Sequence, residues 1–468
     1  MYNPLWKSYI YLYPMKRPAL SLAFILAAAL TASAAPPELK MGLREAEART
    51  LQNSPELKSA ESERAAAHER TRNQFTLLWP KLSLDASYKY ISEVPSFKPL
   101  PTGPSIALGD NKNTSYGPTA SWLLWDSGNL YHNWKSQTAI EKAKNENVLK
   151  IKRQLLFQTR MAYFQVQLAL EQVKSLIESL KLSDAQYNDI KIQQRAGARS
   201  RMDVLSAHQD VLTRRLELRQ ARADLAAALR ELLYLTGTDI PPDASAPVDK
   251  KDEQGMPAET EAPTLLLALD PLKDSETYLA SAAEGSPNEN HPLPQSLLEM
   301  AQAADELSKS LNSDYGPSLQ VSGRISRDYP NGPILETITQ KTVGVNATWP
   351  LFQWGKTRYA VKEQKNRAET TRFEREQVLL NLKRDWDKAQ DQLKGRRAQE
   401  EINKQSVLET KELAKLTYSS YVAGRSSYLE VQTANLRALE TNIRTARTNV
   451  QILIQLAILD SIGKGNLP

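Results

Sequence analysis

Few residues of this chain belong to the types that hold metals or form covalent intermediates. The sequence of 468 residues has no cysteine, seven methionines that form no cluster, and four scattered histidines, His68, His132, His208 and His291. Without cysteine neither disulfides nor thiolate metal sites can form, and histidines so far apart lack the spacing of a metal site. We therefore expect no metal and no cofactor.

Motifs of catalysis are missing as well. Gly463-Lys464 is followed by Gly465 and lacks the upstream glycine of a phosphate-binding loop. The sequence contains neither a nucleophile elbow nor a motif of paired acids. An enzyme is therefore the least favoured interpretation.

Two short motifs do place acids at defined positions, Ser200-x-x-Asp203 and Ser427-x-x-Glu430. A serine followed by an acid three residues later is typical of a capping box, in which both side chains accept hydrogen bonds from backbone N–H groups at a helix start. An acid there also favours the positive end of the helix dipole. Capping is the leading interpretation of both acids, and it does not exclude a second role.

The helices that carry these motifs are very long. Asn129 to Arg195 spans 67 residues without glycine or proline, and Lys356 to Val422, 227 positions later, spans another 67 with Gly395 as its single glycine. One helix of that length extends roughly 100 Å, which no ordinary globular core requires. Each is followed by a glycine, Gly197 or Gly424, that can end a helix.

The two halves of the chain are related by an internal duplication. Identical residues recur at an offset of 227, as in Gly117/Gly344, Trp122/Trp349, Gly128/Gly355, Gly197/Gly424 and Val204/Val431. Each unit reads helix, strand, loop, strand, very long helix, tight turn and helix. The pattern indicates duplication of one large unit of mixed α and β structure.

The helices carry the spacing of a coiled coil. Apolar residues recur at intervals of three and four, as in Val166, Ala169, Val173, Leu176 and Leu180. Polar residues fill the other faces, which predicts closely packed helices standing in water. Residues 41–76 form a further predicted helix, which Pro55 interrupts and Ser54 can cap.

Four segments change to a period of two: residues 81–91, 116–125, 318–326 and 342–351, with loops at 92–114 and 330–341. The apolar side includes Leu84, Ala120, Val321 and Val345, and the polar side includes Ser83, Ser121, Ser322 and Asn346. Each segment has about ten residues, the length of a transmembrane β-strand, with aromatic residues near its ends. We predict that the apolar side faces lipid and the polar side a lumen. A soluble two-sided sheet is the alternative.

Four strands cannot close a barrel, and an open sheet edge cannot lie in lipid. If these strands span a membrane, copies of the chain must share one barrel, with eight strands in a dimer or twelve in a trimer. About eight strands are filled by their own side chains, so only the trimer leaves an aqueous lumen.

Residues 1–34 have the pattern of an export signal. Lys16 and Arg17 precede the apolar stretch Ala19 to Leu30, which is too short to span a bilayer, and Ala32-Ser33-Ala34 offers a cleavage site. We expect the mature chain to start near Ala35.

The charge of the mature chain is close to balanced. Removing residues 1–34 deletes three cations and no acids, which leaves 57 Lys and Arg against 54 Asp and Glu, a net charge of +3. That balance does not favour a nucleic-acid partner. Translation from Met1 and translation from Met15 both stay open.

We divide the mature chain into a first repeat at 35–239, a linker or surface excursion at 240–294 and a second repeat at 295–468. The middle segment holds nine of the 26 prolines. Within it, Leu265 to Leu269 is expected to form a short helix, and helical character resumes at Gln295 to Leu311.

The sequence resembles TolC-like outer-membrane efflux proteins. It shares with them the signal peptide, the duplicated strand–strand–long-helix unit, the Ala-Gly tips and the Trp-Pro-Leu-Phe-x-x-Gly turn at Trp349 to Gly355, weaker at Trp122 to Gly128. The resemblance covers essentially the whole mature chain. It implies a homotrimer with a twelve-stranded transmembrane β-barrel in outer-membrane lipid and an α-helical coiled-coil barrel across the periplasm. It also implies a periplasmic adaptor and an inner-membrane transporter as partners, in efflux or type I secretion.

The resemblance also implies a gate at the periplasmic entrance. In that family an aspartate at the position of Asp203 is held by a tyrosine at the position of Tyr421 and by an arginine, which keeps the duct closed. The family's arginine position is Ser426 here, and Arg425 is the nearest substitute.

The family also has two acidic rings at this entrance, of which Glu430 occupies the first, whereas Thr433 stands at the second. The helical tips are the expected adaptor-docking surface, with Gly197, Arg199, Gly424 and Ser427. The alternative to a duct is a periplasmic coiled-coil scaffold without a pore, which would extract with the soluble periplasm.

Overall fold

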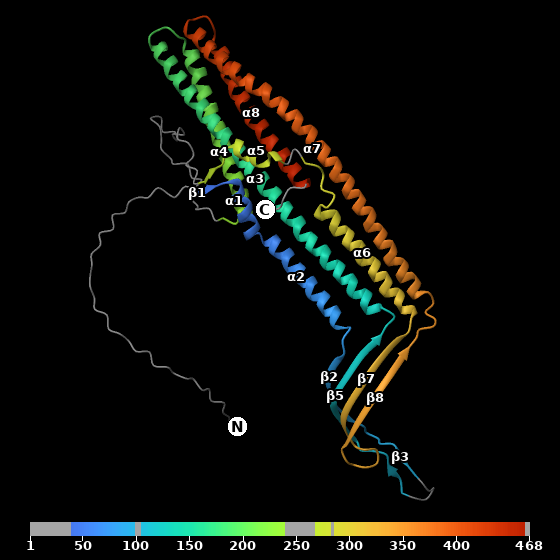
Figure 1. Cartoon of the computed structure of the whole chain (residues 1–468). Helices are drawn as coiled ribbons and strands as arrows, with labels where there is room; N and C mark the ends of the chain where they lie inside the picture. The colour runs from blue at the N-terminus through green and yellow to red at the C-terminus, as the bar shows by residue number, and fades with distance from the viewer. Residues whose placement is uncertain (1–38, 99–103, 239–266, 282–284, 464–468) are drawn as a thin grey trace, which may run out of the picture.

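The structure is a computed structural model that describes residues 39–98, 104–238, 267–281 and 285–463. The predicted signal peptide, residues 1–34, and residues 240–266 of the predicted linker lie outside these ranges. The molecule is elongated: helices run along one long axis, and a single four-stranded sheet continues them at one end (Figure 1).

The elements follow the predicted order of helices and strands. The helices are α1 (Leu43–Asn53), α2 (Pro55–Thr76), α3 (Asn129–Arg195), α4 (Arg201–Thr236), α5 (Leu272–Leu279), α6 (Pro292–Asn312), α7 (Lys356–Val422) and α8 (Tyr428–Ile462). The strands are β1 (Leu39–Met41), β2 (Lys81–Tyr90), β3 (Ser96–Phe97), β4 (Ile106–Ala107), β5 (Lys112–Trp125), β6 (Leu267–Leu269), β7 (Ser318–Tyr329) and β8 (Ile338–Thr348).

The two long helices are confirmed at their predicted bounds. Both α3 and α7 have 67 residues. Each starts directly after a glycine in the left-handed conformation, Gly128 with φ 94° and Gly355 with φ 84°, which a residue with a side chain adopts only with strain. Because neither helix contains proline, its hydrogen-bond ladder continues from the sheet to the far tip, roughly 100 Å away.

Helix α3 is the centre of the bundle. It packs against α2 and α6 toward the sheet and against α4 and α8 toward the tips, and α7 packs on α6 and α8 (Figure 1). The predicted seam is confirmed, since its residues lie in the main core cluster: Val166, Ala169, Val173, Leu176 and Leu180. Full burial of one such aliphatic side chain stabilises the fold by about 1.5–3 kcal/mol. None of the described helices combines the length and apolar character needed to cross a lipid bilayer.

The main sheet has the order β2-β5-β7-β8, and all three of its ladders are antiparallel. Ala120 lies opposite Leu82, Trp122 opposite Val321, and Val321 opposite Val345. Cross-strand partners share one face of a sheet. The apolar sides predicted for the four separate segments therefore form one continuous face, and the polar sides form the other.

The strand bounds differ from the predicted ones at several places, which include the end of β7 at Tyr329 and the start of β8 at Ile338, inside the predicted loop 330–341. The hairpin between β2 and β5 extends into the predicted loop 92–114, because β5 already starts at Lys112 and β3 pairs with β4 beyond it. Strand β8 runs from Ile338 only to Thr348, so Trp349 and Leu351 lie outside it. Thr348 pairs with the first residue of β7, and Pro317 before it has no N–H with which to continue the ladder.

The prediction of a short helix at Leu265 to Leu269 is wrong. Its described part, Leu267–Leu269, is β6, which pairs in parallel with β1. Tyr163 supports the turn out of β6, because its hydroxyl donates to the backbone oxygen of Met41 at 3.1 Å and accepts from the backbone N–H of Asp270 at 2.8 Å. Pairing with a strand distant in sequence thus overrides the local helical preference.

Two helix starts follow from their caps. The predicted break at Pro55 is confirmed, and Ser54 Oγ accepts from the backbone N–H of Leu57 at 3.3 Å. Helix α6 starts at Pro292 rather than at the expected Gln295. His291 caps it by accepting from Leu293 N at 3.2 Å, and proline suits the first position of a helix.

A buried ionic cluster joins α1, α3, α5 and α8. Arg160 on α3 is ion-paired with Glu47 on α1 and with Asp460 on α8, and the Tyr278 hydroxyl on α5 donates to Glu47 at 3.0 Å. Burial alone would lower the pKa of Arg160, but the two acids raise it overall. Loss of one partner from a buried ion pair is strongly destabilising, so these ion pairs hold α1, α3 and α8 together. The Tyr278 hydroxyl attaches α5 to the same cluster.

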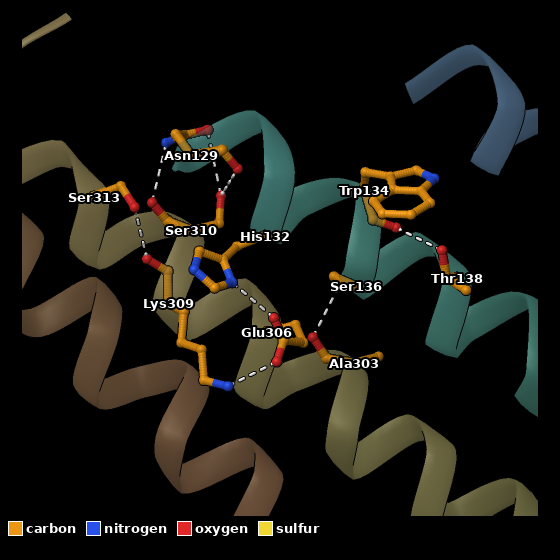
Figure 2. A network of polar contacts seen from close by, with 10 residues as sticks. All are labelled: Asn129, His132, Trp134, Ser136, Thr138, Ala303, Glu306, Lys309, Ser310 and Ser313. Atoms are coloured by element: carbon orange, nitrogen blue, oxygen red, sulfur yellow. Dashed lines mark hydrogen bonds and ion pairs between the residues drawn. The ribbon is translucent and has the colours of Figure 1, made fainter. Parts of the chain in front are cut away.

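A second polar network joins the start of α3 to the end of α6 (Figure 2). Asn129 Nδ2 donates to the backbone oxygen of Ser310 at 3.1 Å, and Ser310 Oγ donates to that of Asn129 at 3.0 Å. Glu306 lies 2.8 Å from His132 Nδ1 and accepts from Lys309 Nζ at 2.7 Å. Burial would raise the pKa of Glu306, but Lys309 and His132 lower it overall. The network thereby holds together α3, which follows β5, and α6, which precedes β7.

Candidate functional site

The apolar face of the sheet is open in the single chain. Leu84 is 80% exposed and Val343 is 82% exposed, and other large apolar residues of this face are exposed with them: Leu82, Tyr88, Trp122, Leu124, Ile325 and Val345. A contiguous exposed apolar surface marks contact with lipid or with another protein. This face is the first part of the candidate site.

Tryptophans mark the boundary between the sheet and the helices. Trp122 Nε1 donates to the backbone oxygen of Leu78 at 3.0 Å, and Trp349 Nε1 donates to that of Tyr315 at 2.9 Å. The two tryptophans occupy equivalent positions of the sequence repeat. Indole rings that keep one polar contact are typical of a membrane–water interface.

Within the described residues the sheet is open at both edges. Strand β2 is hydrogen-bonded only to β5, and β8 only to β7. An edge strand presents a row of backbone donors and acceptors, which are costly to leave unpaired in an apolar environment. Strands β2 and β8 therefore each present an edge with which a further strand can pair.

The second part of the site is formed by the tips of the two helical hairpins. Gly197 with φ 79° and Gly424 with φ 76° end the two long helices, and a Cβ atom at either position would meet nothing within 4 Å. Glycine is thus needed there for its backbone conformation and not for space.

The two predicted capping boxes are not equally complete. Ser427 Oγ accepts from Glu430 N at 3.4 Å, and the Glu430 carboxylate accepts from Ser427 N at 3.2 Å. Ser200 Oγ accepts from Asp203 N at 3.1 Å. In the described part of the chain the Asp203 carboxylate has no hydrogen bond, so Glu430 caps its helix fully and Asp203 only lies at the helix start.

Tyr421 is the buried centre of the tips. It is 1% exposed and packs in a small apolar cluster with Ile190, Ala207, Tyr428 and Val431. These residues come from α3, α4, α7 and α8. The cluster therefore joins both hairpins of one chain.

Arg199 is the arginine that meets Tyr421. Its guanidinium lies 4.0 Å from the centroid of the Tyr421 ring, and it also donates to the backbone oxygens of Tyr421 and, at 3.2 Å, of Val422. Arg199 Nε donates to Gln193 at 3.0 Å. For the Arg425 side chain, by contrast, the described residues provide no hydrogen bond or ion pair.

The sequence repeat contained a signal for this arrangement. Arg199 lies 227 positions before Ser426 and is its counterpart in the repeat. Ser426 is the position at which the resemblance described above implies an arginine. The guanidinium thus reaches Tyr421 from the other hairpin, and Arg425 lies one residue away from the matching place.

The charges around the tyrosines are arranged asymmetrically. Burial and the Asp203 charge raise the pKa of Tyr421, and the Arg199 charge opposes them. The Tyr421 hydroxyl is buried without a hydrogen-bond partner in the described chain. The Tyr418 hydroxyl donates to Asp189 at 2.9 Å, and burial together with this bond raises the pKa of Tyr418 to about 12.

A buried polar layer between the tips and the apolar seam was missed in the sequence. Ser183 Oγ donates to Asp210 at 2.9 Å, and Arg214 on the next turn of α4 pairs with the same acid at 3.5 Å. Asn435 donates to Gln186 at 2.9 Å. The i,i+4 spacing of Asp210 and Arg214 was the available signal, although their burial could not be read from it.

The described residues contain no group of three or more His, Asp or Glu side chains placed to hold a metal ion.

An elongated helical bundle that ends in a small antiparallel sheet is the fold of solved outer-membrane channels. Residues 48–238 and 289–462 match the family described as outer membrane efflux protein. The chain belongs to this family. Membership implies an outer-membrane location with a periplasmic portion.

Solved structures share this fold. The outer-membrane channel OprN is 19% identical, with a TM-score of 0.71 over 91% of this chain and 91% of that chain. The CmeC outer membrane channel of Campylobacter jejuni is 17% identical, with a TM-score of 0.71 over 90% of this chain and 85% of that chain. The outer membrane protein VceC of Vibrio cholerae is 16% identical, with a TM-score of 0.71 over 90% of this chain and 96% of that chain. Comparison with curated proteins gave no match.

Proposed function

We propose that this chain is the outer-membrane duct of a tripartite export system, which passively releases solute delivered by an inner-membrane transporter through a periplasmic adaptor. The observation that carries the proposal is the sheet: one face is polar, the other is apolar and exposed, and both edges are open. A soluble scaffold would have to cover that face, whereas lipid covers it in a barrel.

The proposed assembly is a homotrimer. Three copies of four strands give a barrel of twelve, in which β8 of one copy pairs with β2 of the next. Two copies would give eight strands, whose own side chains fill the interior. The trimer is therefore the smaller assembly with an aqueous lumen, and the long helices would continue that lumen into the periplasm.

The proposed domain division follows the repeat. Each of the units 35–239 and 295–468 supplies two strands and one long hairpin to the duct. Segment 240–294 is proposed as an excursion at the equator of the bundle, which fits the position of β6 and α5 beside α1 and α8 (Figure 1).

The hairpin tips are proposed as the entrance and the adaptor-docking surface, with Gly197, Arg199, Gly424 and Ser427 at the turns. Asp203, the buried Tyr421 and an arginine are proposed to latch the entrance, and Glu430 is proposed to set its charge. Since Arg199 contacts Tyr421 within one chain, we assign to Arg199 the role of holding the tyrosine, and leave Arg425 available for a neighbouring copy or for the adaptor.

Fractionation of cells that produce the protein tests this function. A duct fractionates with the outer membrane and needs detergent for extraction, and its loss makes cells retain the exported solute. Recovery of the protein in the soluble periplasm, with solute export unchanged in its absence, would support the scaffold instead.

A further inference from the structure

The sheet is curved toward its polar side. Along β5 the polar-side residues Ser115, Gly117, Thr119 and Ser121 are partly or fully buried, whereas the residues between them are exposed. The same holds in the second half of β7, from Arg324 to Asp328, whereas Gln320 and Ser322 nearer the helices are exposed. One side of a strand is shielded in this way when the sheet bends around it. The polar side is therefore the concave side, which faces the lumen if copies of the chain share one barrel.

An ionic cluster on this concave side joins β5 to β7. Arg324 Nη2 donates to Ser115 Oγ at 2.8 Å, and Ser115 Oγ donates to Asp328 Oδ1 at 2.5 Å. Ser326 Oγ donates to Asp328 Oδ2 at 2.9 Å. Both oxygens of the acid are thus occupied.

The arginine of this cluster is less fully engaged than the acid. A guanidinium carries five N–H donors, and Arg324 uses one hydrogen bond to Ser115 among the described residues. The Arg324 charge acts on Asp328, but among the described residues the two side chains form no direct ion pair and are bridged by the Ser115 hydroxyl. The Arg324 Nε is buried, and the remaining Nη donors are available to a negatively charged group that passes along the wall.

The other charged residues on the concave side come from β2, which contributes Lys81, Asp85 and Lys89. With Arg324 and Asp328, each chain places three cations and two acids on this side, a net charge of +1. A trimer would carry +3 along the same wall.

We propose that Arg324 and Asp328 set the charge selectivity of the barrel section, where Arg324 favours anionic solutes and Asp328 opposes it. The inference rests on the proposed duct function. Rings of Arg or Lys side chains favour anions in a pore, and rings of Asp or Glu favour cations.

Reversal potentials of purified trimers in a planar bilayer under a salt gradient test the proposal. Arg324→Gln shifts the anion-to-cation permeability ratio toward cations, and Asp328→Asn shifts it toward anions. Arg327→Gln is the matched control, because Arg327 lies on the convex side of the same strand, opposite Tyr116. This control leaves the ratio unchanged.

A second measurement changes the charge of the concave side without replacing a residue of the Arg324–Asp328 cluster. The chain has no cysteine, so Ser322→Cys provides a single thiol on the concave side, opposite Ser121 and Gly344. Modification with a cationic thiosulfonate shifts the ratio toward anions, and modification with an anionic one shifts it toward cations.

The outcomes separate this inference from the proposed function. If wild-type trimers conduct but the two charge variants do not shift the ratio in opposite directions, or thiol modification leaves it unchanged, the inference is overturned and the duct remains. If wild-type protein forms no channel at all, the duct fails and takes this inference with it.

Discussion

The guanidinium of Arg199 lies 4.0 Å from the centroid of the Tyr421 ring and also donates to the backbone oxygens at the end of α7. One side chain from the first hairpin thus contacts the aromatic face and the helix end of the second. A carbonyl at a helix C-terminus carries partial negative charge, so both the helix end and the aromatic ring stabilise the cation. The two tips of one chain are tied to each other by this residue.

Replacing Arg199 should loosen the tips. A cation–π contact is worth about 0.5–2 kcal/mol, and hydrogen bonds to a charged group about 1.5–3 kcal/mol. Arg199→Ala should therefore raise the single-channel conductance of trimers in a planar bilayer, and Arg199→Lys should restore it only in part because lysine lacks the planar fork.

Two controls accompany the Arg199 variants. Arg425→Ala should raise the conductance less than Arg199→Ala does, because the Arg425 side chain makes no hydrogen bond or ion pair with the described residues of its own chain. Tyr421→Phe keeps the ring that Arg199 covers and removes a hydroxyl without a partner, so it should also change little. A conductance increase for Arg425→Ala or Tyr421→Phe as large as that for Arg199→Ala would contradict this assignment.

The two sides of β2 should respond oppositely to charge. Leu84→Arg places a cation on the exposed apolar face, which in mid-bilayer costs roughly 2–4 kcal/mol. Ser83→Arg places it on the polar face and should be tolerated. Trimer yield from outer membranes checks this, and equal yields for the two variants would argue against a lipid-facing side.

Much of the helical architecture could be predicted because it depends on local rules. The bounds of α3 and α7 follow from the absence of proline and from the glycines that flank them, Gly128, Gly197, Gly355 and Gly424. The faces of the strands follow from a period of two. The sequence alone could not pair the strands, but register in a sheet preserves faces, so the predicted sides came together correctly.

Features that depend on distant contacts could not be predicted in this way. Pairing of β6 with β1 joins residues that α3 and α4 separate in the sequence. The stacking of Arg199 on Tyr421 depends on which side of the tip each hairpin presents. The resemblance placed the arginine at the position of Ser426, so that Arg425, one residue earlier, was the nearest candidate in the second hairpin. The arginine that stacks on Tyr421 comes from the first hairpin instead.

Gly117 is required where β5 approaches β7. A Cβ atom at this position would lie 2.0 Å from the backbone oxygen of Ile325, whereas one at Gly323 would meet nothing within 4 Å. Gly117→Ala should therefore disturb the β5–β7 ladder and lower trimer yield, and Gly323→Ala should not. A yield of Gly117→Ala equal to that of the Gly323→Ala control would show that the ladder can relax.

His291 should make stability fall in mild acid. Burial, and after it the Arg153 charge, lowers the pKa of His291 from 6.5 to about 4. Between these two values the unfolded chain takes up a proton that the folded chain does not, so folding stability is lost as the pH falls through this window, by up to about 3 kcal/mol.

The variant His291→Asn isolates this contribution. Asparagine can still cap α6 but does not titrate, so its loss of stability between pH 7 and pH 4 should be smaller than that of wild type. Denaturant unfolding of the detergent-solubilised protein measures both. Equal losses for wild type and variant would assign the acid sensitivity to other groups.

In the proposed trimer, the open edges β2 and β8 of neighbouring copies pair and close one barrel of three chains. Because the chain has no cysteine, Ser83→Cys can be combined in turn with cysteine at Gln340, Thr342, Gly344 or Asn346 of β8. Paired strands bring Cα atoms within about 5.5 Å, which a disulfide can bridge. In oxidised outer membranes, at least one combination should yield cross-linked species of two and three copies and nothing larger. Failure of every combination to cross-link, or a ladder that continues beyond three copies, would contradict the proposed trimer.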